Sequence, residues 1–98
     1  MGKALALIIA ERQMSESFEL LDIARDISGN LCLIYGSGPT DPAPFVLTLT
    51  PQYVARVSGK TPPVSLHEIE RYADNNAGDL RETALLEKGT GRLNLILE

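Results

Sequence analysis

The sequence predicts an α+β domain, in which an antiparallel sheet of four to five strands is covered on one face by one short and one longer helix. Short apolar runs with strand-like alternation occur early in the chain, separated by segments rich in Gly, Pro, Ser and Asp. An amphipathic helical pattern follows at residues 66–88, and alternation returns at residues 93–97. The chain is long enough for one core but too short for two, so residues 1–98 are expected to form a single domain.

Three early runs are predicted to be strands. Residues 4–10 form a short apolar segment bounded by polar residues, which is typical of a strand buried on both faces, although its alanines and leucines also suit a helix. Residues 18–24 and 30–35 flank a connector that contains Gly29, and this arrangement predicts a hairpin. The apolar spacing of residues 18–24 is also compatible with a helix.

The faces of the predicted hairpin follow from its alternation. Leu31, Leu33 and Tyr35 are expected to share one face of the sheet, whereas Cys32 and Ile34 point to the other. Because Cys32 lies in mid-strand between two leucines, we expect its thiol to be buried and chemically inert.

The segment 36–44 is predicted to be a loop, because its three prolines remove backbone donors and its two glycines add conformational freedom. Strand alternation resumes at residues 45–49. Thr50 and Pro51 then have the residue types of a helix N-cap and first helical position, so a short helix is expected over residues 51–58.

The helical pattern at residues 66–88 begins with a capping box, in which Ser65 is followed three positions later by Glu68. Its apolar residues recur every three or four positions and form one stripe. The weak helix formers of residues 75–79 predict either a kink or two separate helices. Residues 93–97 alternate like a strand and carry no charge, so this strand is expected to pair within the chain or across a dimer interface.

Composition limits the class of function. The 13 acidic and 9 basic residues give a net charge of −4, which disfavours binding to nucleic acid or to anionic membranes. The single cysteine cannot form a disulfide within the chain, and no apolar stretch approaches the roughly 20 residues of a membrane span. We therefore expect a cytoplasmic protein without a membrane span, and nucleic-acid binding ranks third among the functions considered.

The sequence contains no evident catalytic, metal-binding or cofactor-binding constellation. Cys32 and His67 are the only thiol and imidazole, and His67 is expected to face solvent in the first turn of its helix. Gly59, Lys60 and Thr61 match the end of a phosphate-binding loop, but the prolines that follow exclude the helix such a loop requires. No cofactor and no metal are therefore expected, and enzyme activity stays uncertain, with a non-enzymatic role favoured.

Two functions from different classes follow. The first is a small soluble intracellular binding or regulatory module that acts through protein–protein contact, with a homo-oligomer as the expected assembly, because catalytic residues are lacking and uncharged strands are available for pairing. The alternative is a small-molecule or anion-binding enzyme that uses the loop 36–44 together with Arg56 or Lys60. Ser37, Arg56 and Lys60 are thus the candidate binding residues.

Overall fold

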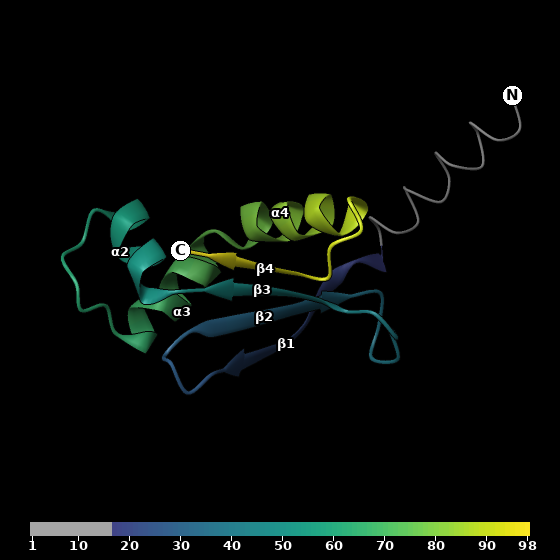
Figure 1. Cartoon of the computed structure of the whole chain (residues 1–98), viewed down its shortest axis with the longest axis horizontal. Helices are drawn as coiled ribbons and strands as arrows, with labels where there is room; N and C mark the ends of the chain where they lie inside the picture. Colours follow the sequence, from purple (N-terminus) through teal and green to yellow (C-terminus); the bar gives the residue numbers. More distant parts are fainter. Residues whose placement is uncertain (1–16) are drawn as a thin grey trace, which may run out of the picture.

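The computed structural model describes residues 17–98, which form a four-stranded sheet with three helices packed against it (Figure 1). The strands, in their order across the sheet, are β1 (Glu19–Arg25), β2 (Leu31–Gly36), β3 (Phe45–Leu49) and β4 (Asn94–Leu97). The α+β class and the mostly antiparallel sheet are confirmed. The strand predicted at residues 4–10 lies outside the described residues.

Three helices connect β3 to β4, and two of them begin where the sequence predicts. The helices are α2 (Pro51–Ser58), α3 (Leu66–Asn75) and α4 (Ala77–Gly89). Thr50 Oγ1 accepts a hydrogen bond from Tyr53 N at 3.1 Å, which caps α2, and Gly59 ends this helix with a φ of 65°. Ser65 Oγ accepts from Glu68 N at 3.3 Å and caps α3.

The predicted interruption of the long helix separates two helices at Asn76. Asn76 N and Nδ2 both donate to the carbonyl oxygen of Tyr72, at 3.0 and 2.9 Å, so the asparagine closes the end of α3. Its own carbonyl oxygen accepts from Leu80 N at 3.0 Å and starts α4, although its side chain does not cap that helix. One residue thus ends one helix and begins the next.

Strand β4 runs parallel to β3, whereas the sequence predicts an antiparallel sheet throughout. Val46 N donates to Leu93 O at 3.0 Å and Thr50 N to Leu97 O at 3.2 Å. The parallel direction arises because the helical crossover returns the chain to the end of the sheet at which β3 begins. Pairing of this strand within the chain is confirmed, and it leaves β4 at one edge of the sheet.

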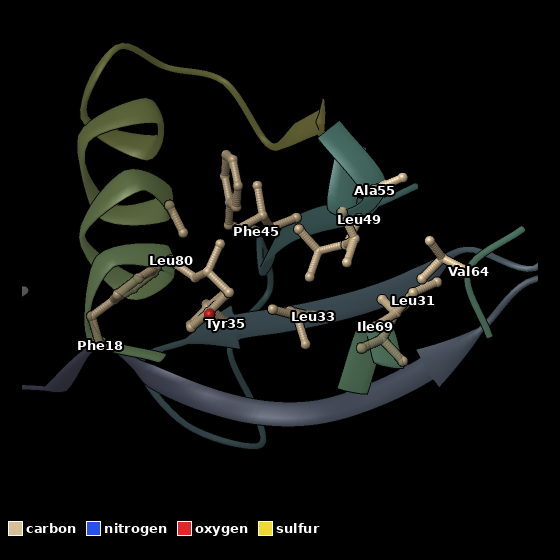
Figure 2. Packing of buried hydrophobic residues seen from close by; sticks show 13 residues of the cluster. Phe18, Leu31, Leu33, Tyr35, Phe45, Leu49, Ala55, Val64, Ile69 and Leu80 are labelled. Carbon is tan, nitrogen blue, oxygen red and sulfur yellow. The ribbon is translucent and has the colours of Figure 1, made fainter. Parts of the chain in front are cut away.

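The hydrophobic core lies between the sheet and the helices (Figure 2). Six strand residues face it, each at most 3% exposed: Leu31, Leu33, Tyr35, Phe45, Leu47 and Leu49. The shared face predicted for the β2 residues is therefore confirmed. Phe18, Tyr35 and Leu80 pack together at one end of the core, where the Phe18 and Tyr35 rings stack with centroids 5.5 Å apart, and Val64 and Ile69 lie toward the other end.

Candidate functional site

The sheet face opposite the helices carries two rows of side chains that cross all four strands. The first row runs from β1 to β4 through Ala24, Cys32, Thr48 and Ile96. The second row runs through Asp22, Ile34, Val46 and Asn94. These eight residues are called the outer face below. Within residues 17–98, no helix covers the outer face, because the helices pack on the side of the buried leucines.

The outer face is largely apolar in its centre, where Thr48 is the one polar side chain and is 9% exposed, and it is polar at two of its corners. Its one charged residue, Asp22, lies on the edge strand β1, and Asn94 lies on the opposite edge strand. Ile34 and Val46 are half-buried by their neighbours in the sheet, and Ile96 is 54% exposed. Such a face presents hydrocarbon to water over the width of the sheet.

Cys32 differs from its predicted environment. Its side chain is half-buried rather than buried, because it points to the outer face and away from the helices. The sulfur lies 3.7 Å from Thr48 Oγ1, its cross-strand neighbour on β3. The alternation of β2 correctly predicts that Cys32 lies on the face opposite Leu31 and Leu33. It does not predict the burial of that face, which depends on the side of the sheet that the helices cover.

A groove opens on the helix side of the sheet, between β1 and α3, with a volume of about 560 Å³. Leu20, Ile23 and Arg25 of β1 form one wall. Leu20 and Ile23 are 45% and 51% exposed, although their β2 partners, Tyr35 and Leu33, belong to the core. The helices pack mainly on β2, β3 and β4, so the sheet is one strand wider than the layer that covers it. We call this feature the β1–α3 groove.

The helix wall of the β1–α3 groove is formed by Glu70, Ala73, Asp74 and Ala77, whose spacing places them along one side of α3 and the start of α4. The sequence predicts that the alanines of this stripe pack closely on the sheet. Ala84 of this stripe is fully buried, as predicted, but Ala73 is half-buried and Ala77 is exposed. Their small side chains leave the central part of the groove open.

Three charged side chains line the β1–α3 groove. Arg25 Nη2 and Glu70 Oε1 form an ion pair at 2.6 Å, which joins β1 to α3. Asp74 lies one helical turn beyond Glu70 and has no hydrogen-bond or ion-pair partner among the described residues. Burial raises the pKa of the Tyr35 phenol, which therefore stays protonated at neutral pH. The groove consequently combines apolar side chains with three charged groups whose net charge is −1.

Ser37, a predicted binding residue, is engaged within its own loop. Its backbone N and its Oγ both donate to Asp41 Oδ2, at 2.9 and 3.2 Å. Ala43 N donates to the other carboxylate oxygen at 2.9 Å, and Lys88 Nζ lies 3.3 Å from Oδ2. These hydrogen bonds lower the pKa of Asp41 to about 2, and the two from the backbone N–H groups contribute most. The loop is thus organised around an ionised aspartate.

The other two predicted binding residues lie at the opposite end of β3 from Ser37, because the loop precedes this strand and α2 follows it (Figure 1). Arg56 donates to the backbone carbonyl oxygen of Glu98. Lys60 Nζ pairs with Glu68 Oε2 at 3.2 Å. The structure therefore does not bring Ser37 together with Arg56 or Lys60, and each basic residue has an interaction of its own.

Lys60 lines a polar cleft of about 390 Å³ between the end of α2 and α3, together with Arg71 and Tyr72. Tyr72 shares a hydrogen bond of 3.4 Å with the hydroxyl of Tyr53. Burial raises the pKa of Tyr72 to about 12, and this hydrogen bond is the second-largest cause of the increase. The phenol therefore stays protonated at neutral pH and does not provide a general base there.

The described part of the chain lacks the usual marks of a catalytic or metal centre. Residues 17–98 contain no group of three or more His, Cys, Asp or Glu side chains placed to hold a metal ion. In the same residues, each buried side-chain nitrogen or oxygen has a hydrogen-bond partner. His67 is exposed at the start of α3, as predicted. No helix among those described is long and apolar enough to cross a membrane.

Comparison with protein-family models, with curated proteins and with solved structures finds no match for this chain. Function is therefore inferred from the chemistry of the two apolar surfaces, the outer face and the β1–α3 groove. The sequence signals neither surface directly. The one related pattern in the sequence is the mixture of apolar and charged residues in β1, which is typical of a strand at the edge of a sheet.

Proposed function

We propose that the protein is a small binding module that acts through protein–protein contact, and that a second copy of the chain covers the outer face. The observation that carries the proposal is the outer face, on which Cys32, Ile34, Val46 and Ile96 form an apolar area that no helix among residues 17–98 covers. Removing apolar surface from water contributes about 25 cal/mol per Å². An apolar face of this kind is typical of a surface that a partner covers.

A second copy suits the outer face because the face is almost uncharged. In a dimer with two-fold symmetry the same patch meets itself, so a charged patch would oppose a like charge. Asp22 is the one charged residue of the face and lies at its edge, away from the centre. Two sheets pack face to face at about 10 Å through interdigitated side chains, and isoleucine and valine suit this arrangement.

The cytoplasm is the compartment we propose for this module. The sequence contains one cysteine, so the fold needs no disulfide and no oxidising environment. The half-buried thiol of Cys32 on the outer face would stay reduced there and would act as a small apolar group in the proposed interface.

The other functions have less support. An enzyme that uses the loop 36–44 requires Ser37 to act with Arg56 or Lys60, and these residues lie at opposite ends of β3. Nucleic-acid binding requires a contiguous basic surface, and neither row of the outer face contains a lysine or an arginine.

The dimer is tested by sedimentation of the intact chain across the micromolar range. We expect the wild-type protein to sediment as a dimer, and Ile96→Lys to raise the dissociation constant by more than about tenfold, because the lysine would bury an unpaired charge in an apolar interface. Ile96 is 54% exposed, so the substitution leaves the core intact.

The matched control is Leu86→Lys, since Leu86 is 68% exposed on α4 and does not belong to the outer face. This variant should retain the wild-type dissociation constant. A wild-type protein that stays monomeric over the whole concentration range would rule out the dimer. Equal effects of both substitutions would contradict an interface at the outer face.

A further inference from the structure

We propose that the β1–α3 groove binds an extended peptide segment of a partner protein, with apolar side chains at alternate positions and a lysine or arginine at one end. This proposal goes beyond the proposed function, because the groove lies on the helix side of the sheet and does not require self-association. The residues of the two walls of the groove specify the charge of the bound peptide.

The length of the groove fits a short extended segment. Its β1 wall extends from Leu20 to Arg25, which corresponds to about 17 Å at 3.3 Å per residue. A peptide of about five residues has the same length when extended. Alternate side chains of such a peptide point to the same side, so its first, third and fifth residues face the groove together.

The middle of the groove selects apolar side chains. Leu20 and Ile23 face it from β1, and Ala73 from α3, while Leu33 of β2 lies at its floor. The volume of about 560 Å³ lies within the range of pockets that bind small ligands, roughly 300–1,000 Å³, and is sufficient for two apolar side chains.

The charged side chains of the groove select a basic residue. Arg25 is neutralised by Glu70 at 2.6 Å, and Asp74 remains without a partner among the described residues. The three groups therefore leave one net negative charge, which lies on the helix wall at Asp74. A lysine or arginine of the bound peptide would compensate it, whereas a glutamate or aspartate would be repelled.

The exposed edge of β1 indicates that side chains, rather than a new strand, hold the peptide. Ile23 N donates to Asp22 Oδ1 at 2.8 Å, so the carboxylate occupies a backbone donor of this edge strand. The strand also contains a bulge between Leu20 and Asp22. Both features oppose the regular ladder that strand addition requires. The peptide is accordingly expected to lie between β1 and α3 and to insert its side chains into the groove.

The experiment uses the full chain and two fluorescein-labelled pentapeptides, Lys-Ser-Leu-Ser-Leu and Glu-Ser-Leu-Ser-Leu, followed by fluorescence anisotropy. The wild-type protein should bind the lysine peptide roughly two- to fivefold more tightly than the glutamate peptide, because the ion pair with Asp74 is solvent-exposed. The charge-reversed variant Asp74→Lys should prefer the glutamate peptide. Absence of binding to both peptides up to about 1 mM, or an unchanged preference in Asp74→Lys, would overturn the proposal.

Two isoleucines provide a matched pair of variants for the apolar part. Ile23 lines the groove and is 51% exposed, so Ile23→Glu should lower the affinity for the lysine peptide at least about tenfold while the protein stays folded. Ile27 lies in the adjacent turn, fully exposed and outside the groove, and Ile27→Glu should bind as the wild type does. Equal losses in the two variants would refute binding in the groove.

The result is independent of the dimer at the outer face. Ile96→Lys should bind the lysine peptide with wild-type affinity even if it no longer self-associates. If the peptide instead converts a wild-type dimer into monomers, the groove is the contact between two copies, and the peptide-binding proposal is wrong.

Discussion

Thr50 makes two side-chain hydrogen bonds that join distant parts of the chain. Its Oγ1 accepts from Tyr53 N at 3.1 Å at the start of α2, and it donates to Leu97 O at 2.8 Å at the end of β4. The residue is 6% exposed, so both groups lie away from water. A hydroxyl with both a donor and an acceptor role is well suited to this position.

We therefore expect Thr50→Val to lower the free energy of unfolding by about 1–3 kcal/mol, because it removes a helix cap and leaves a backbone carbonyl with one partner fewer. Ser65→Ala removes only the cap of α3 and should cost about 0.5–2 kcal/mol. Urea unfolding measures both values. A larger loss for Ser65→Ala than for Thr50→Val would contradict the double role of Thr50.

Asp41 makes stability depend on pH under acidic conditions. Its pKa is about 2 in the folded protein, below the ordinary value of 3.8, because backbone N–H groups of Ser37 and Ala43 donate to the ionised carboxylate. The stabilisation is complete above the unfolded pKa and is lost as the pH falls from about 4 toward 2. Urea midpoints measured across this window should fall less steeply in Asp41→Asn than in the wild type, and equal slopes would exclude Asp41 as the cause.

The elements themselves follow closely from local sequence. Both the hairpin strands and the helix starts lie within one or two residues of their predicted positions, because caps and alternation are local properties. The break near Asn76 was also predicted, although the choice between a kink and two helices depends on contacts with the sheet. The direction of β4 was not predictable from its own residues, because it depends on the path of the helices between β3 and β4.

The start of α4 contains a site at which stability should increase. Gly78 lies within the helix, has no positive φ, and a Cβ added there would meet no other atom within 4 Å. Gly78→Ala should therefore raise the free energy of unfolding by about 0.4–1 kcal/mol, because alanine has fewer conformations to lose on folding. Thermal unfolding provides the measurement.

Gly36→Ala is the corresponding substitution in the sheet and should have the opposite sign. A Cβ at Gly36 would lie 2.8 Å from both Asp41 Oδ2 and the Leu21 side chain. The protein must then move the loop or the first strand, which costs stability. A gain in stability from Gly36→Ala would contradict the steric argument at Gly36, and no gain from Gly78→Ala would show that helix propensity does not decide the effect at Gly78.

At the scale of the molecule, the candidate surfaces result from a mismatch between two layers. Among residues 17–98 the sheet has four strands, but the helices of this part of the chain cover mainly β2, β3 and β4 and lie on one face only. One consequence is the β1–α3 groove, which lies beside the uncovered strand β1. Another is the outer face. Leu20 and Ile23 resemble core residues in the sequence, and only the width of the helix layer makes them accessible. This property belongs to the assembly of elements, so no local pattern predicts it.

The parallel pairing of β3 with β4 also governs the order in which the sheet can be completed. Strands β1 to β3 are neighbours along the chain and can pair through short connections, whereas β4 must wait for all three helices to bring it back. Until it arrives, one edge of β3 is unpaired, and β3 contains the buried residues Phe45, Leu47 and Leu49. We therefore expect an incompletely folded molecule to present the hydrophobic edge of β3 to other chains, and pairing with β4 to remove this route to aggregation.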